Sequence, residues 1–162
     1  GVVLGPVVSK THREKVVNYI EQGVKDGAEL MLDGRKTSVK EYPDGAFLGP
    51  TLFDGVTPEM TIAKEEIFGP VLAVQTFEDE AEAVALGNRS MYGLAAGIWT
   101  KDIAKAHRTA RAIKAGTVWI NTYNFYDAAA PFGGYKASGF GRDLGAEALE
   151  GFLETKTVWV SL

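Results

Sequence analysis

Apolar residues recur at helical spacing in the first part of the chain. Val16 and Ile20 stand four residues apart within an otherwise polar stretch that ends at a glycine. Thr11 followed by Glu14 has the spacing of a capping box, in which each side chain satisfies a backbone N–H of the first helical turn. The pattern predicts an amphipathic helix over residues 11–26.

Strand and helix patterns alternate along the next hundred residues. Runs that favour β structure occupy residues 28–32, 47–53, 71–77, 94–99 and 117–120. Helical patterns at 78–86 and 102–113 each follow one of these runs. Alternation of this kind is typical of an α/β fold, so we expect a parallel sheet flanked by helices.

The periodicity stops after Asn121. A glycine-rich and aromatic segment continues to Leu144 and is followed by a short helical pattern at 146–152 and a Thr- and Val-rich strand pattern at 154–162. Loops of this length within a domain usually carry function. The segment after Asn121 is therefore a candidate for ligand contacts.

Composition narrows the class of protein. The chain has 162 residues, of which 46% are hydrophobic, enough for the core of one ordinary domain. Its formal net charge of -4 comes from interleaved acidic and basic residues, which gives no footprint for nucleic acid or an anionic membrane. With no apolar stretch of roughly 20 residues, we expect a soluble, cytoplasmic protein.

Cysteine is absent from the sequence. Within these residues that excludes a disulfide, a thiolate metal site and a cysteine nucleophile, and we expect no metal. The sequence begins with Gly1 in an apolar run that continues to Val8. We therefore expect that the chain starts partway through a domain.

The stretch Thr-Ile-Ala-Lys-Glu-Glu-Ile-Phe-Gly-Pro at 61–70 lies between two extended runs, where an open α/β sheet places a ligand-binding loop. A carboxylate such as Glu66 can accept hydrogen bonds from both hydroxyls of a ribose, and Phe68 offers an apolar face to a nicotinamide ring. The residue types alone equally suit a solvated acid beside a core aromatic.

This stretch resembles the EEIFGP motif of the NAD(P)-dependent aldehyde dehydrogenase superfamily, and so does Pro-Phe-Gly-Gly-Tyr-Lys-Ala-Ser-Gly-Phe-Gly-Arg at 131–142. Further matches are Gly5-Pro6 and the stretches at 92–96, 116–121, 144–145 and 155–158. The resemblance spans essentially the whole chain. It implies that residues 1–152 are the C-terminal portion of a catalytic domain and that residues 153–162 are an oligomerisation strand.

The resemblance also implies the chemistry. In this family a cysteine thiolate attacks an aldehyde, hydride passes from the thiohemiacetal to NAD or NADP, and water hydrolyses the thioester. The family's cysteine and general-base glutamate precede the region where this sequence starts, so we expect no catalytic residue in this chain and no activity from it alone. The alternatives are a non-catalytic binding or assembly module of the same fold and a coenzyme-A-acylating aldehyde dehydrogenase.

Five residues match cofactor contacts of the family. Glu66 is similar to the ribose-binding glutamate, Phe68 to the aromatic beside it, and Leu94 to an apolar wall near the nicotinamide. His12 and Lys15 match positions on the helix that approaches the adenosine end of the cofactor. A solvated helix face is an equally good account of His12 and Lys15. The choice between NAD and NADP stays open, because the residues that read the ribose 2′ position precede this sequence.

The substrate side is matched by the loop at 123–130 and the adjoining Phe132, which resemble a wall of the substrate tunnel. We expect Tyr126 and Phe132 to face an apolar or aromatic aldehyde, although rings of this size also pack readily in a core. Asn121 matches an asparagine near the active site. Its alternative role is to tie down the following loop.

Assembly is implied by residues 155–162. The matching strand of the family joins a sheet with a neighbouring subunit, and an exposed strand edge invites such pairing. The resemblance therefore predicts that the full-length protein is a homodimer or homotetramer that uses Thr155 to Leu162.

Overall fold

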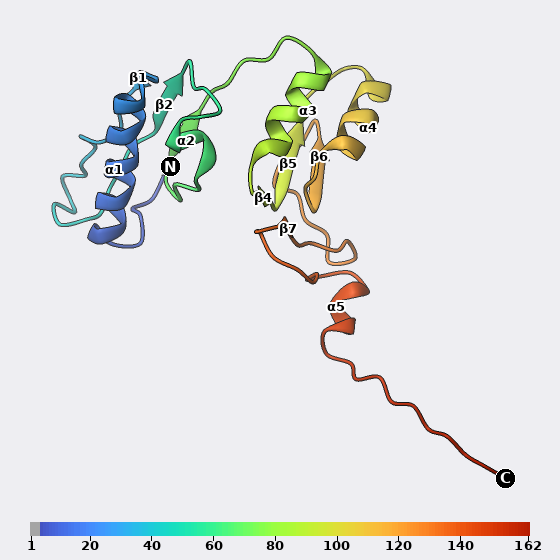
Figure 1. Cartoon of the computed structure of the whole chain (residues 1–162). Helices are drawn as coiled ribbons and strands as arrows, with labels where there is room; N and C mark the ends of the chain where they lie inside the picture. Colours follow the sequence, from blue (N-terminus) through green and yellow to red (C-terminus); the bar gives the residue numbers. More distant parts are fainter. Residues whose placement is uncertain (1–3) are drawn as a thin grey trace. The chain divides into compact units, whose positions relative to one another are not determined.

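The computed structural model describes residues 4–162, so the start of the apolar run predicted at 1–8 lies outside the described residues. The chain divides into two units, one ending at Phe77 and the other beginning at Glu78. Each unit contains its own helices and strands (Figure 1). The boundary between the units is one that the residue pattern did not reveal.

The first unit begins with helix α1, Lys10–Asp26. The helix N-cap is Ser9, whose hydroxyl accepts a hydrogen bond from the backbone N–H of His12 at 3.0 Å. The predicted capping box at Thr11 is therefore wrong, because Thr11 already lies inside the first turn. Gly27 ends the helix in the left-handed conformation, with φ of 98°, where a glycine carries no steric penalty.

Three short strands form the sheet of this unit. Strand β2, Thr51–Asp54, lies between β1, Glu29–Leu32, and β3, Val71–Ala73. β1 pairs with β2 antiparallel, whereas β2 pairs with β3 in parallel. The one-turn helix α2, Thr61–Lys64, lies in the connection between the two parallel strands.

The core of the first unit lies between α1, α2 and β2. Phe53, Val16 and Ile20 are completely buried there. Leu48, Val56, Ile62 and Ile67 complete the buried cluster together with Ala28. Because Thr51 and Phe53 alternate with half-buried residues along β2, one face of that strand points into the core.

The second unit contains a strand–helix–strand crossover. Strands β5, Ala95–Ile98, and β6, Thr117–Ile120, are parallel and are joined by helix α4, Ile103–Ala112. Helix α3, Glu80–Arg89, contacts α4. Asp79 and Asp102 cap these helices through hydrogen bonds from the backbone N–H groups of Glu82 and Lys105.

The glycine-rich segment after β6 has little regular structure. Its strand β7, Tyr135–Lys136, pairs antiparallel with β4, Tyr92–Gly93. Phe132 and Asp143 form an isolated antiparallel bridge. The single-turn helix α5, Glu147–Glu150, then follows and is shorter than the predicted 146–152.

The predicted α/β class is confirmed, but the predicted parallel sheet is found only in part. The described residues form three small sheets, in which the β2–β3 and β5–β6 ladders are parallel and the β1–β2 and β4–β7 ladders antiparallel. β1 runs antiparallel because the loop between it and β2 turns the chain back. Arg13 fixes that loop by donating to the backbone oxygens of Phe47 and Arg35 at 2.7 and 2.6 Å.

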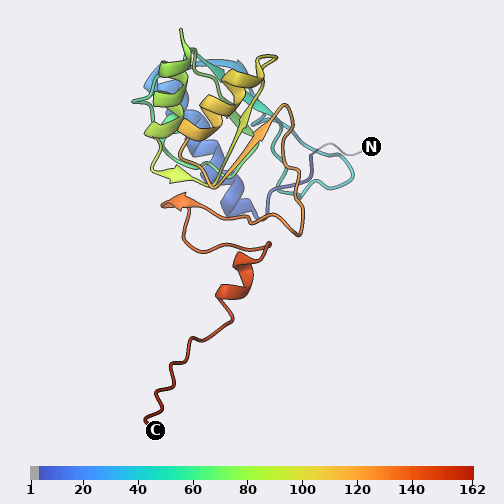
Figure 2. The ribbon, with the colours of Figure 1, turned by 90° about the vertical axis from the view of Figure 1, so that its right-hand side faces the viewer.

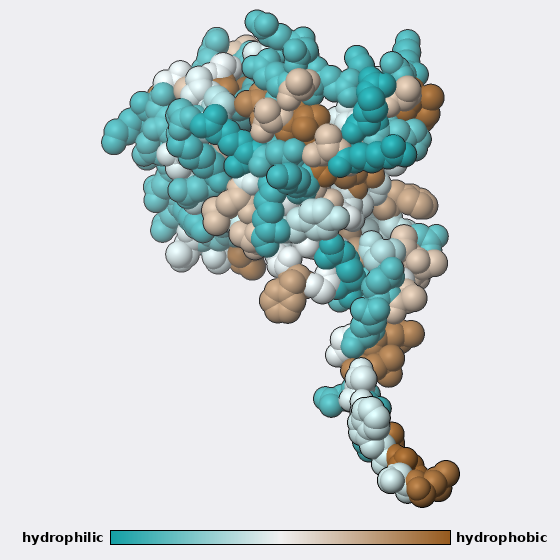
Figure 3. Space-filling model, turned by 45° about the vertical axis from the view of Figure 1, so that its right-hand side comes forward, coloured by the Kyte–Doolittle hydropathy of each residue, from teal (hydrophilic) through white to brown (hydrophobic). Residues whose placement is uncertain are grey.

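The predicted strand at 154–162 does not form within this chain. Residues 153–162 run as an extended tail beyond α5 and form no strand (Figure 2). Val158 and Trp159 are 75% and 93% exposed, and hydrophobic residues gather at the far end of the tail (Figure 3). A strand needs a neighbouring edge for its backbone hydrogen bonds, and the described residues offer none to this segment.

Along residues 4–162, no helix combines the length and apolar character needed to cross a membrane.

Candidate functional site

The loop at 61–70 begins with the first turn of α2, which is hydrogen-bonded to the last residue of α1. The Asp26 carboxylate, at the last residue of α1, accepts a hydrogen bond from the backbone N–H of Thr61 at 2.9 Å. This hydrogen bond is the main reason that the pKa of Asp26 lies below its usual value, and a second bond from Gln22 adds to it. The interaction contributes stability above the unfolded-state pKa and loses it as pH falls through the lowered one.

The end of the loop is fixed by close packing. Ile67 is buried, whereas Phe68 has φ of 55° and is 74% exposed. A Cβ on Gly69 would lie 2.6 Å from Val16 Cγ1, so only a glycine lets the backbone approach α1 this closely. The loop therefore turns Ile67 inward and Phe68 outward, and Phe68 is not a core aromatic of this unit.

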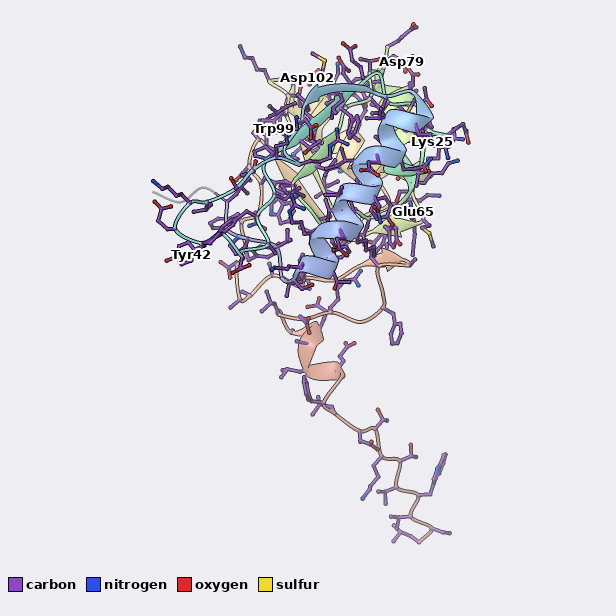
Figure 4. All side chains as sticks on the ribbon, turned by 90° about the vertical axis from the view of Figure 1, so that its left-hand side faces the viewer. Lys25, Tyr42, Glu65, Asp79, Trp99 and Asp102 are labelled. Carbon is purple, nitrogen blue, oxygen red and sulfur yellow. The ribbon has the colours of Figure 1, made fainter. Side chains whose placement is uncertain are left out.

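The two glutamates of the loop differ in their surroundings. Glu65 Oε2 accepts a hydrogen bond from the Tyr19 hydroxyl of α1 at 2.7 Å, and Figure 4 shows Glu65 beside that helix. Glu66 is exposed, and among the described residues its carboxylate makes no hydrogen bond or ion pair. An unpaired carboxylate next to an outward-facing ring is chemically suited to hydroxyl groups beside a flat ring system.

His12 and Lys15 lie on α1, as the sequence predicts. The backbone N–H of His12 is used by the Ser9 cap, and its side chain is half-buried. The Lys15 ammonium lies 5.9 Å from the centre of the Tyr19 ring, a cation–π distance. Lys15 is thereby linked through Tyr19 to the 61–70 loop, whereas no hydrogen bond links His12 to that loop.

Leu94 connects β4 to β5 in the second unit. Its side chain is 41% exposed, and its backbone oxygen accepts a hydrogen bond from Thr117 N at 3.2 Å. The backbone contact ties Leu94 to the start of β6. The leucine therefore presents part of its side chain to solvent from a fixed backbone position.

Asn121 directly follows β6 and has a φ of 55°. Its side-chain amide makes two hydrogen bonds of 2.9 Å with Thr100, accepting from the backbone N–H and donating to the backbone oxygen. Asn121 therefore holds a loop in place, as its structural alternative predicts. The loop that it holds follows β5 rather than β6. A hollow of about 460 Å³ at these strand ends is lined by Asn121, Thr100, Trp99, Lys101 and Ile103.

Tyr126 and Phe132 belong to one aromatic cluster. Their ring centres are 5.1 Å apart at an interplanar angle of 83°, and Tyr126 meets Trp119 edge-on at 5.6 Å. Trp119 is buried and donates its indole N–H to the Phe125 oxygen at 2.8 Å. Tyr126 is 48% exposed and Phe132 half-buried. The cluster is therefore buried on the side of Trp119 and exposed to solvent on the side of Tyr126.

Sequence reasoning missed the residues that support these side chains. Tyr19 lies one helical turn from Lys15, a signal that could have placed it on the same face of α1. Glu65 was treated only as part of a motif, and Trp119 only as part of a strand. No pattern in the sequence could have paired Tyr19 with Glu65, which stands 46 residues later.

The chain is similar in sequence to proteins of one known family. The model of the aldehyde dehydrogenase family matches residues 1–158. The chain is 51% identical over 158 residues to a betaine aldehyde dehydrogenase of Agrobacterium fabrum, covering 98% of this chain and 32% of that relative. The chain belongs to the aldehyde dehydrogenase family.

Solved structures of aldehyde dehydrogenases are also similar to this chain. The NAD+ complex of an aldehyde dehydrogenase from Bacillus cereus has 52% identity and a TM-score of 0.92, covering 99% of this chain and 32% of that one. An indole-3-acetaldehyde dehydrogenase of P. syringae, also in complex with NAD+, has 46% identity and a TM-score of 0.90, covering 97% of this chain and 31% of that one. The chain thus spans about a third of the length of the relatives it matches.

Proposed function

We propose that this chain is the C-terminal portion of the catalytic domain of an NAD(P)-dependent aldehyde dehydrogenase, which oxidises an aldehyde to a carboxylic acid through a cysteine thiohemiacetal and a thioester. The nucleophile and the general base lie elsewhere in the longer polypeptide. The main support is the 61–70 loop, which presents an unpaired Glu66 carboxylate and an outward-facing Phe68 in a chain of this family.

By resemblance to the family, the cofactor side takes Glu66, Phe68, Lys15 and His12 from the first unit and Leu94 from the second. Glu66 accepts hydrogen bonds from the ribose hydroxyls, while Phe68 and Leu94 supply apolar contacts to the nicotinamide. Lys15 and His12 serve the adenosine end from α1. The bound cofactor supplies the acceptor for the hydride. The residues present fit such a group, because a free carboxylate and an exposed ring stand two residues apart on a backbone fixed by Val16 and Asp26.

The substrate side is formed by the open face of the aromatic cluster. Tyr126 and Phe132 pack edge to face and favour an apolar or aromatic aldehyde. Asn121 shapes this side by holding the strand ends. Changing Tyr126 or Phe132 to Ala in the intact enzyme should alter the preference among aldehydes more than cofactor affinity. Equal losses for every aldehyde together with a lower melting temperature would mark the rings as core residues.

Assembly uses Thr155 to Leu162, the extended tail. Its exposed Val158, Trp159 and Val160 supply an apolar strand for a neighbouring subunit in a dimer or tetramer. Deleting residues 155–162 from the intact protein should lower the oligomeric state measured by light scattering. Recovery of the original oligomer would refute this role.

The first test concerns catalysis. The isolated 162-residue chain has no cysteine, so no thiohemiacetal can form and NADH production from an aldehyde should be undetectable. An upstream reading frame that encodes a Gly-Gln-x-Cys segment would eliminate the non-catalytic alternative. Release of an acyl-coenzyme A instead of the free acid by the intact enzyme would identify the coenzyme-A-acylating alternative.

The second test concerns Glu66. In the intact enzyme, Glu66→Gln should weaken cofactor binding about tenfold, because a neutral amide accepts hydrogen bonds less strongly than a carboxylate. Glu41→Gln is the matched control, since Glu41 is exposed in the same unit and outside the loop. Unchanged cofactor affinity in Glu66→Gln would count against the proposed function.

A further inference from the structure

The 61–70 loop is held against α1 at its beginning, middle and end. Asp26 accepts the hydrogen bond from Thr61 N at the beginning, and Val16 packs on Gly69 at the end. The middle is held by the 2.7 Å hydrogen bond from the Tyr19 hydroxyl to Glu65 Oε2. Of the three contacts, only the middle one depends on a single hydroxyl group.

Glu65 is the residue through which this contact can act on its neighbour. It is the C-cap of α2 and has extended backbone angles, φ of -111° and ψ of 148°. Successive side chains point to opposite sides of an extended backbone. When Tyr19 holds Glu65 toward α1, Glu66 is turned away from the helix toward solvent.

Two adjacent carboxylates would otherwise be interchangeable partners for a ligand. Glu65 and Glu66 have the same chemistry and the same reach, so a loosely held loop could present either one. The Tyr19 hydrogen bond occupies Glu65 and leaves Glu66 unpaired among the described residues. A preordered loop also loses less conformational freedom when a ligand binds.

We propose that Tyr19 is a positioning residue for the cofactor-binding loop, which acts by sequestering Glu65 and aiming Glu66. This inference rests on the proposed function, in which Glu66 binds the cofactor ribose. Tyr19 does not touch the reacting atoms. Tyr19 therefore affects the affinity for the cofactor. It does not change the rate of the chemical step or the affinity for the aldehyde.

The test is Tyr19→Phe in the intact enzyme, a change that keeps the ring beside Lys15 and removes only the hydroxyl. The KM for NAD+ should rise roughly three- to tenfold, the range expected for one lost hydrogen bond. kcat and the KM for the aldehyde should stay within about twofold. Tyr42→Phe is the matched control, because Tyr42 lies on a loop at the other side of α1 (Figure 4) and packs its ring on Phe47.

Variants of Glu65 separate positioning from general stability. Glu65→Ala removes the anchor of the loop and should reproduce the part of the loss that comes from a poorly aimed Glu66, whereas Glu65→Gln, which keeps an oxygen acceptor, should restore most of the affinity. The double variant Tyr19→Phe/Glu65→Ala should be no weaker than Glu65→Ala alone, because both changes break the same bond.

Three results would overturn the inference: normal NAD+ affinity in Tyr19→Phe, additive losses in the double variant, or losses spread equally over every kinetic parameter with a lower melting temperature. A Glu66→Gln enzyme with weakened cofactor binding beside a normal Tyr19→Phe enzyme would refute the role of Tyr19 alone. Normal binding in both would refute the proposed function as well.

Discussion

The unit that ends at Phe77 and the unit that begins at Glu78 bury their apolar side chains to different extents. The first closes a core around Phe53, with Val16 and Ile20 also fully buried. In the described part of the second, the buried apolar residues are Ala106, Ala115 and Trp119. Several aromatic side chains of the second unit are exposed to solvent, with Phe125, Trp99 and Tyr123 at 70%, 65% and 58% exposure.

The difference concerns how each unit supports the side chains that we propose as its ligand contacts. In the first unit, the 61–70 loop contributes Ile62 and Ile67 to a closed core, so Glu66 and Phe68 project from a well-packed segment. In the second, the aromatic surface itself is left uncovered. Exposed apolar area of this kind marks a surface for a ligand or another part of a protein, since leaving it in water costs free energy.

The largest expected effect tests the closed core. Phe53→Ala should destabilise the first unit by about 3–5 kcal/mol, because it removes a completely buried ring. Phe140→Ala, in the second unit, removes a fully exposed ring and should change stability by less than about 0.5 kcal/mol. Hydrogen exchange of the α1 amides reports on the first unit. Equal effects of the two substitutions would break the comparison.

The second prediction concerns the strand ends of the other unit. Asn121→Gly keeps the positive φ accessible but removes two hydrogen bonds to Thr100, and should cost about 1–3 kcal/mol. Asn124→Gly is the control, since Asn124 also has a positive φ of 61° and its side chain has no hydrogen bond to the described residues. Tryptophan fluorescence follows this unfolding, because all three tryptophans belong to the second unit. Equal costs would show that the amide clamp contributes nothing.

Two glycines within helices, one in each unit, compare how tightly the two units are packed. Gly87→Ala in α3 should stabilise the second unit by about 0.5–1 kcal/mol, since the added methyl meets only the flexible end of Ile113. Gly23→Ala in α1 places a methyl 3.0 Å from the Phe53 ring and from Ile62. It should destabilise the first unit by up to about 2 kcal/mol. Thermal unfolding of both variants is the measurement, and a gain at Gly23 would show that the core is loosely packed.

The smallest effect concerns the contact between α3 and α4. Arg108 donates to Glu80 at 3.0 Å, and this hydrogen bond is the main reason that the pKa of Glu80 lies below 4.5. The stabilisation is present above the unfolded-state pKa and is lost as pH falls through the lowered one. Arg108→Gln should cost less than about 1 kcal/mol at neutral pH, because the arginine is exposed and the glutamate only half-buried.

The same substitution predicts a pH dependence. The stability difference between the wild type and Arg108→Gln should shrink as pH falls below 4.5. Arg111→Gln, an exposed arginine in the last turn of α4, is the control. Denaturant titrations at several pH values measure both variants. A difference that grows in acid would contradict the assignment of Glu80 as the titrating partner.

The sequence by itself determined the α/β class, the approximate positions of α1, α3 and α4, and the strands β5 and β6. It also indicated the candidate ligand-binding loop, because the 61–70 and 131–142 motifs are short continuous runs of residues. These signals are local. Helical and strand periodicities arise from residues two to four positions apart, so they survive in a linear reading of the chain.

Only the tertiary structure decided what surrounds those residues. It placed Phe68 outside and Ile67 inside, paired Tyr19 with Glu65 across 46 positions and joined Asn121 to Thr100 across 21. It also reversed β1 against β2 and left Thr155 to Leu162 without a strand partner among the described residues. Such outcomes depend on distant segments that meet in space, and their free energies come from burial and hydrogen bonds that no local pattern encodes.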